Sequence, residues 1–371
     1  MRDVLLPLLR LGLGYGSTEE VNLSDYIMLP AKNWDELGEF ARKQGVLGIM
    51  LDGVEQLEST RLGATRELNV NQKLEWIGEV LMIEQRNRQQ ISVMDDLATK
   101  WSNNGCRVMV MKGQANATLY PKPKHRNPGD IDCYLFEHYS DGNIIARQEG
   151  GIVDESWYKH SVISYKGETF ENHQFFVHTR EGKRSKLLEK ELEDALKADE
   201  GEFKQLTPST IMPPVQWTAM FLTYHACAHF LTEGLRLKQV LDWATFLKAH
   251  QNDVNWKEFY AFCESYHLKI FAETITAISC AYLGVEISNP SIIKDSIHTE
   301  KVLNSILYDD DYIYSESEGG WKEKWHLVRN LFHYRWKYKE IYKDSIWKQL
   351  WYYTIGYLLK TEIEQHKLKE Q

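Results

Sequence analysis

Two aspartates at alternate positions open an apolar segment, and they constrain the fold more than any other feature. The segment reads GDIDCYLF over residues 129–136 and predicts a buried strand. Side chains alternate along a strand, so Asp130 and Asp132 share one face while Ile131 points to the other. Paired carboxylates repel each other unless a cation, a proton or a basic side chain lies between them. We therefore expect the pair to bind a hard divalent cation, which prefers oxygen ligands.

A short segment upstream of the pair has the pattern of a phosphate-binding turn. CRVMVMKG predicts a strand that ends in glycine, and QANATLY after it predicts a brief helix. Free backbone N–H groups and the positive end of the helix dipole at such a turn attract phosphate. Lys112, Arg126 and one of Lys124 and His125 are candidates to neutralise phosphate charge. Arginine is the better candidate because its guanidinium binds phosphate through two parallel hydrogen bonds.

The order of these features resembles the DNA-polymerase-β-type nucleotidyltransferases, specifically a poorly characterised bacterial group with an LKG, YP, R and DID signature. The resemblance covers roughly residues 30–280. It implies an NTP bound through its phosphates and two Mg²⁺ (or Mn²⁺) ions. An acceptor would attack the α-phosphorus, and pyrophosphate would leave. The phosphate-binding residues that the resemblance implies are Lys112, Gly113, Gln114 and Arg126.

Members of this superfamily complete the metal site with a third carboxylate on a neighbouring strand, and the resemblance assigns this role to Glu171. ETFENHQFF has a glutamate where the family shows an acid, one residue and then histidine. The resemblance implies that Glu171 activates the acceptor hydroxyl or binds the second metal, and that His173 contacts substrate or phosphate. Alternation places both on one face of the strand. Glu168 and Asp154 are weaker substitutes.

Two departures from the family pattern keep other functions open. Gln114 stands where the wider superfamily has a phosphate-binding serine, and glutamate replaces the commoner aspartate at position 171. A catalytically weak nucleotide sensor is therefore the alternative function. Glycosyltransferases that use nucleotide sugars also carry D-x-D, but they place it after a doubly wound nucleotide-binding region, which the helical residues 33–97 do not offer. A D-x-D alone also occurs as strand-end caps or solvated loop carboxylates.

A second group of candidate residues lies in the C-terminal half, where HACAH places two histidines one helical turn apart. Zinc is an alternative ligand here, but two histidines without a HExxH glutamate or an evident fourth ligand fall short of a site. The resemblance includes such a helix, which would close the nucleotide pocket. We expect a structural role for His225, with Arg236 and Asp242 paired. A contact of His229 or Arg236 with the base or ribose is the second interpretation.

The predicted fold class is α+β, with a small mixed or antiparallel sheet between helical regions. Residues 1–100 form an N-terminal helical region, residues 101–205 the nucleotidyltransferase core, and residues 206–371 a C-terminal helical domain whose first long helix spans 209–231. The last stretch, from Trp321 to about Gln365, is rich in Trp, Tyr and Lys. We favour packing and domain contacts for it over a membrane surface. A sensor would recruit a protein partner through these aromatic helices.

The net charge and the cysteine pattern exclude some classes of binding partner and indicate the cellular compartment. The net charge of −9 argues against general binding to nucleic acid or anionic membrane. The five cysteines are widely spaced and form no CxxC pair, a pattern typical of reduced thiols in the cytoplasm. No apolar run approaches the length of a transmembrane helix. We therefore expect a soluble cytoplasmic protein whose partners are an NTP and a small-molecule or protein acceptor that no motif identifies.

Overall fold

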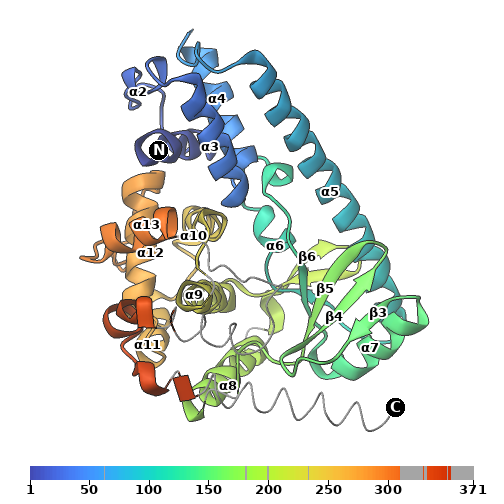
Figure 1. The fold of residues 1–371 in the computed structure, drawn as a ribbon. Coiled ribbons are helices and arrows are strands. Elements are labelled where there is room, and N and C mark those ends of the chain that lie inside the picture. The colour runs from blue at the N-terminus through green and yellow to red at the C-terminus, as the bar shows by residue number, and fades with distance from the viewer. Residues whose placement is uncertain are drawn as a thin grey trace.

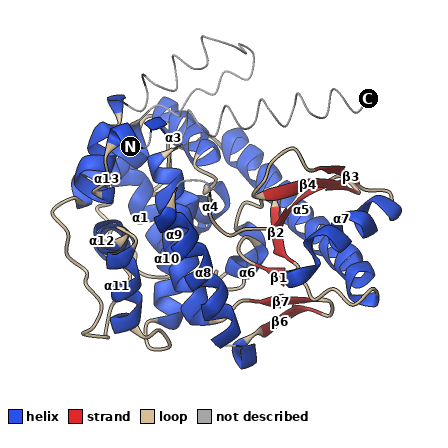
Figure 2. Cartoon of the chain, turned by 90° about the horizontal axis from the view of Figure 1, so that it is seen from below, coloured by secondary structure: helices blue, strands red, loops and turns tan. Residues whose placement is uncertain are grey.

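One mixed sheet and a larger body of helices lie side by side in the chain (Figures 1 and 2). The architecture is α+β with helices flanking the sheet, which confirms the predicted fold class. The computed structural model describes residues 1–61, 63–179, 182–198, 200–232, 234–309, 329, 332–348 and 350–351.

The sheet has seven strands in the order β3-β4-β5-β2-β1-β7-β6. They are β1 (Met109–Val110), β2 (Ile131–Tyr134), β3 (Ile152–Asp154), β4 (His160–Tyr165), β5 (Glu168–His173), β6 (Lys204–Thr207) and β7 (Thr210–Met212). β2 pairs in parallel with β5, and β1 with β7, whereas the other neighbours are antiparallel. The strands that the sequence predicts around the aspartate pair, β1, β2, β4 and β5, therefore form the middle of the sheet and most of one side.

The helices before and within the sheet are α1 (Arg2–Gly12), α2 (Ser24–Ile27), α3 (Ala31–Lys43), α4 (Leu47–Thr60), α5 (Val70–Asn103), α6 (Gln114–Ala117), α7 (Tyr139–Gln148) and α8 (Lys183–Ala198). Those after the sheet are α9 (Val215–Leu231), α10 (Leu237–His250), α11 (Trp256–Ser265), α12 (Lys269–Leu283) and α13 (Thr299–Tyr308). Short 3₁₀ turns cover Pro123–His125, Phe136–His138 and Glu200–Glu202, and a π-helix covers Lys337–Tyr342.

The helix that the sequence predicts over 209–231 begins too early, and this part of the prediction is wrong. Residues Thr210–Met212 form β7, and α9 begins only at Val215. Pro213 and Pro214 separate the two elements, because proline lacks the N–H that a helix interior needs. The extended backbone of Pro214, with ψ 150°, then serves as the N-cap of α9.

Two hydrophobic clusters hold these layers together. The smaller cluster joins α5 and α7 to the sheet, with the Trp101 ring edge-on to Phe170 and its Nε1 donating to the Gly142 carbonyl at 2.9 Å. The larger cluster joins the N-terminal helices to α9–α13. α1 and α4 pack so closely that a Cβ at Gly12 would meet the Ile49 carbonyl oxygen at 2.0 Å. The N-terminal helices and α9–α13 therefore share one core beside the sheet.

The aromatic C-terminal stretch is described only in part. Trp321 and Trp325 lie outside the described residues. Trp336 packs against Phe230 of α9 with ring centroids 5.8 Å apart, whereas Trp347 is 67% exposed. The predicted packing onto the helical core therefore applies to Trp336 more than to Trp347.

The five cysteines are free thiols, and all but the half-buried Cys280 are buried. None of the helices within the described ranges is both long and apolar enough to cross a bilayer.

Candidate metal and phosphate site

Three carboxylates from two neighbouring strands meet on one face of the sheet. β2 and β5 run in parallel with Asp132 directly opposite Glu171, so both side chains project to the same face. Asp130 precedes β2 by one residue and completes the group, whose carboxylate oxygens lie within 4.8 Å of one another. Asp132 is buried, Glu171 half-buried and Asp130 exposed. The structure therefore brings together the three residues that the sequence assigns to a metal site.

The two weaker candidates for the third carboxylate lie elsewhere. Glu168 belongs to the opposite face of β5, where Gln90 Nε2 of α5 donates to its carboxylate at 3.3 Å. Asp154 lies on β3, at the edge of the sheet and two strands away from β5. Neighbouring strands are about 4.8 Å apart, so Asp154 is about 10 Å from the position of Glu171.

Asp132 has cationic neighbours where a metal ion would otherwise compensate its charge. Lys112 Nζ lies 2.5 Å from Oδ2, and His173 Nε2 lies 3.3 Å from Oδ1. Burial alone would raise the pKa of Asp132, but the Lys112 ammonium and the His173 imidazole hold this pKa well below its usual range. The Lys112 contact lacks hydrogen-bond geometry, so Oδ2 is buried without a hydrogen bond from any described residue. An oxygen in that position suits a cation.

The predicted glycine turn positions Lys112 beside the carboxylates. Gly113 has φ +66°, a backbone conformation that glycine adopts readily, and it is the N-cap of α6, a single helical turn. Gln114, which follows it, is 6% exposed and points away from the carboxylates. Its Nε2 donates to Asn87 Oδ1 at 2.8 Å and to Gln90 Oε1 at 2.6 Å.

α5 thus supports both halves of the site through two buried polar residues that sequence analysis missed. Asn87 Nδ2 donates to the carbonyls of Lys124 and Arg126, and Gln90 Nε2 donates to the Gly129 carbonyl at 2.6 Å. Together with Gln114 they connect the glycine turn to the loop before Asp130. Their spacing of three residues on one helix face is visible in the sequence, but burial of that face is not.

Arg126, a predicted phosphate ligand, is buried in an ion pair. Its Nε and Nη2 each donate to Asp242 of α10 at 2.8 Å, and Tyr120 Oη donates to the same carboxylate at 2.7 Å. Burial opposes the charge of Arg126, but Asp242 raises its pKa above the ordinary value. The predicted Arg236–Asp242 pair is therefore wrong, since Arg236 is the N-cap of α10 and Asp242 pairs with Arg126. A contact between Arg126 and phosphate stays a prediction that requires this pair to open.

Two further lysines face the carboxylates and were not singled out from the sequence. Lys159 is 9% exposed, and burial lowers its pKa although Glu171 and Asp132 act in the opposite direction. Burial, followed by the charge of Arg126, lowers the pKa of Lys238 to about 8. A Cβ added at Gly129 would lie 3.6 Å from Lys238 Nζ, so this ammonium stands beside the loop before Asp130. Neither lysine has an ion-pair partner within 4.0 Å among the described residues, an arrangement that favours an anionic ligand.

The two histidines of α9 lie next to this cluster. His225 Nε2 and His229 Nε2 are 3.1 Å apart, and Phe221 stacks on the His225 ring. Burial first, and then the charge of Lys112, hold the pKa of His225 well below its ordinary value. The intervening Cys227 is buried in the larger hydrophobic cluster. A neutral His225 therefore lies near Lys112 and Asp132, which brings α9 close to the carboxylate group.

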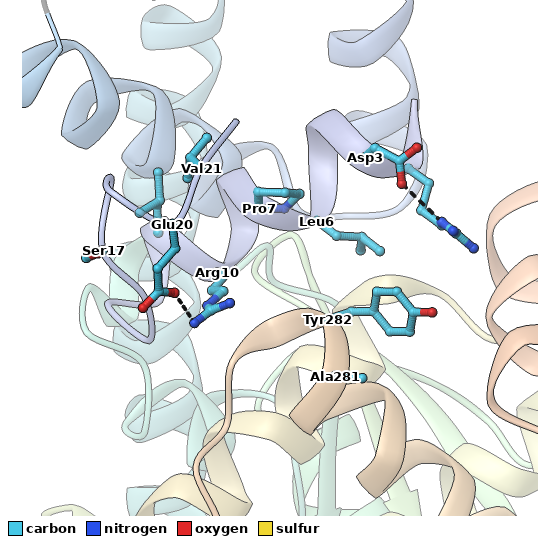
Figure 3. A pocket seen from close by; sticks show the side chains of 11 residues that line it. Asp3, Leu6, Pro7, Arg10, Ser17, Glu20, Val21, Ala281 and Tyr282 are labelled. Carbon is cyan, nitrogen blue, oxygen red and sulfur yellow. Dashed lines mark hydrogen bonds and ion pairs between the residues drawn. The ribbon is translucent and has the colours of Figure 1, made fainter. Parts of the chain in front are cut away.

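A pocket lies elsewhere, between α1 and α12. Figure 3 shows Leu6, Pro7 and Tyr282 around it, with Arg10 and Glu20 paired at its rim. Its volume of about 200 Å³ is below the roughly 300 Å³ of small ligand sites. Because its charged residues already pair with each other, we place the chemistry at the sheet and not in this pocket.

Comparison with known proteins bears on this site. The model of a family described as uncharacterised nucleotidyltransferase matches residues 30–284, which include the carboxylate group, the glycine turn and α9–α12. No curated protein and no solved structure matches the chain.

Proposed function

Because the chain belongs to this nucleotidyltransferase family, we propose that it transfers an NMP group from an NTP to a hydroxyl acceptor and requires Mg²⁺ or Mn²⁺. The carboxylate group of Asp130, Asp132 and Glu171 is the observation that carries the proposal. The group fits a hard divalent cation because all its donors are oxygens and Asp132 Oδ2 is buried without a hydrogen bond. A cation held there supplies charge neutralisation for the phosphates and activation of the attacking oxygen.

In the proposed reaction the acceptor oxygen forms a bond to the α-phosphorus. The bond between the α-phosphorus and its bridging oxygen to the β-phosphate breaks, and the electron pair leaves with pyrophosphate. We assign the acceptor proton to Glu171 in this proposal, because it is half-buried beside Asp132 and reachable from solvent. The assignment of Glu171 as base or metal ligand remains part of the proposal.

Three lysines near the carboxylates support the proposal, because they are candidates to bind the phosphates of the substrate. Lys112 lies on Asp132, where a bound cation would displace it toward the phosphates. Lys159 and Lys238 stand beside the carboxylates without an acidic partner within ion-pair distance among the described residues, and a triphosphate would supply their missing counter-charge. We propose that these ammonium groups, and the backbone of Gly113, bind the phosphates.

Residues of the C-terminal helices are proposed to bind the rest of the nucleotide. His229 on α9 and Arg236 at the start of α10 are the candidates for contacts with the base or ribose. His173 has a different proposed role from the contact with substrate or phosphate that the sequence suggested. It lies between Asp132 and Glu171, at 3.3 Å from each, and so positions the two carboxylates.

A nucleotide sensor is the second candidate function, and one observation favours it. The Gln114 carboxamide is held by Asn87 and Gln90 of α5 and is therefore not directed at a phosphate as a serine hydroxyl would be. A sensor would bind an NTP with Mg²⁺ and release no pyrophosphate with any acceptor.

The deciding experiment incubates the full chain with each of the four NTPs and Mg²⁺ or Mn²⁺, with and without hydroxyl-bearing acceptors. We expect pyrophosphate release and a mass increase of one NMP on the acceptor or on the protein itself. Asp132→Asn is the matched control and should remove both signals. Tight NTP binding without pyrophosphate would favour the sensor, and stronger binding of a nucleotide sugar than of an NTP would contradict both candidates.

A further inference from the structure

A second group of donor atoms lies on the same face of the sheet, one strand beyond the carboxylates. His160 of β4 is directly opposite His173 of β5, and Glu171 stands two residues before His173. His160, Glu171 and His173 each offer one ligand atom, and these atoms lie within 4.8 Å of one another. Only Glu171 belongs to both groups. The two imidazoles distinguish this group chemically from the all-oxygen group beside it.

The hydrogen bond of His173 Nδ1 orients the ring so that its other nitrogen, Nε2, points at Glu171. Its Nδ1 lies 3.1 Å from the Phe175 carbonyl oxygen, which can only accept, so Nδ1 carries a proton. Nε2 faces Glu171 Oε2 and Asp132 Oδ1, both at 3.3 Å, and a metal ion bound in this group would replace the proton that Nε2 shares with these carboxylates. A backbone carbonyl that fixes the tautomer in this way is the usual support of a metal-binding histidine.

His160 is an unsatisfied imidazole within the same group. Its side chain is 15% exposed, Nδ1 is buried without a hydrogen-bond partner among the described residues, and Nε2 lies 3.6 Å from Glu171 Oε1. A buried ring nitrogen normally has a hydrogen-bond partner, and the described residues supply none to Nδ1.

We propose that His160, Glu171 and His173 form a second divalent-cation site that takes an imidazole-binding transition metal such as Zn²⁺ or Co²⁺ in preference to Mg²⁺. Glu171 Oε2 lies 3.3 Å from His173 Nε2, and Glu171 Oε1 lies 3.6 Å from His160 Nε2, close to the roughly 3.4 Å that separates two ligands of a tetrahedral ion. Nitrogen donors favour these metals, whereas Mg²⁺ favours oxygen. A shared Glu171 would link this ion to the carboxylate group, and the proposal does not require nucleotidyl transfer to take place.

The test titrates metal-free full-length protein with Co²⁺ in excess Mg²⁺ and follows visible absorption. We expect one equivalent of Co²⁺ to bind, with bands typical of nitrogen ligation, and Mg²⁺ not to displace it. His160→Gln should weaken Co²⁺ binding at least tenfold, whereas His250→Gln, which changes a histidine paired with Asp253 on α10, should have no effect. Asp130→Asn should weaken Mg²⁺ binding measured by calorimetry and leave Co²⁺ binding intact.

Three results would overturn the proposal: complete displacement of Co²⁺ by Mg²⁺, unchanged Co²⁺ affinity in His160→Gln, or equal loss of Co²⁺ binding in Asp130→Asn. If His160→Gln does not fold, protection of His160 from diethylpyrocarbonate in the unmodified protein replaces it. Co²⁺ should then protect His160 and Mg²⁺ should not, and equal protection by both ions would contradict the site. Pyrophosphate release is measured separately, so Co²⁺ binding without transfer would count only against the proposed function.

Discussion

Asp132 and Asp242 are both buried aspartates with depressed pKa values, yet their surroundings differ. Asp242 is held by two donors of Arg126 at 2.8 Å and by the Tyr120 hydroxyl at 2.7 Å. Asp132 has one lysine contact without hydrogen-bond geometry and one histidine at 3.3 Å. The same residue type is therefore satisfied by its own chain in one region and left short of partners in the other.

This difference separates a structural ion pair from a binding site. A buried carboxylate with a bidentate arginine has its charge and lone pairs satisfied, so nothing further needs to bind. A buried carboxylate beside a second and third carboxylate, without a bidentate partner, keeps oxygens that a divalent cation can ligate. Lys238 lies between the two regions, since the charges of Arg126, Asp242, Lys112 and Asp130 all act on it. Four experiments test this difference between the two regions.

The largest expected effect is the loss of stability in Asp242→Asn. Removing this charge leaves Arg126 buried without its counter-charge, which costs about 3–5 kcal/mol of the free energy of unfolding. Urea unfolding measures the change. Asp132→Asn should cost clearly less, because Lys112 is 18% exposed and can turn toward Glu171 or water. Equal losses in the two variants would mean that the two aspartates do not differ as described.

The second largest effect is on turnover. For turnover, unlike stability, the substitution at Asp132 should have a larger effect than the one at Asp242. Asp132→Asn should reduce nucleotidyl transfer by about 10²–10³-fold, since charge stabilisation in the transition state depends on this carboxylate. Pyrophosphate release by a folded variant measures the loss. Native turnover in Asp132→Asn would remove Asp132 from the catalytic group.

The third effect concerns nucleotide binding by Lys238. Lys238→Met should weaken NTP binding about tenfold at neutral pH, and Lys248→Met on the exposed part of the same helix should not. The pKa of Lys238 is lowered to about 8, so its side chain is a charged ammonium below that pH and a neutral amine above it. Calorimetry should show NTP affinity falling as pH rises through about 8 in the native chain. A parallel fall in Lys238→Met would assign the titration to another group.

The smallest effect is the pH-dependent contribution of His125 to stability. His125 lies in the loop between the two regions. His125 lies 2.9 Å from Asp52 and 3.1 Å from Glu84, and hydrogen bonding to Asp52 raises its pKa above 6.5. A raised folded-state pKa stabilises the protein below pH 6.5, and this stabilisation is lost as pH rises through the raised value. The contribution should be about 1 kcal/mol or less.

Unfolding free energies at about pH 6 and about pH 9 for the native chain and His125→Gln measure this contribution. The native chain should lose more stability between the two pH values than the variant does. The same loss in both proteins would show that His125 does not carry the effect.

Local sequence pattern determined one half of the candidate site. Alternation along a strand is a property of the backbone, so the shared face of Asp130 and Asp132 follows from their spacing alone. The glycine at position 113 likewise predicted a turn, and it has a positive φ in the structure. The α+β class followed from the change between helical and strand-like patterns along the chain.

Only the tertiary structure determines which other residues lie beside Asp130, Asp132 and the glycine turn. The parallel pairing that sets Glu171 opposite Asp132 joins strands almost forty residues apart, and the sequence contains nothing that fixes register between them. Arg126 pairs with Asp242 and not with phosphate because α10 packs against its loop. Lys159, Lys238 and His160 have no motif, because a lone basic residue becomes informative only when burial removes its water and its neighbours are known. Spacing determines what lies on one strand, whereas burial and register depend on elements that are distant in the chain.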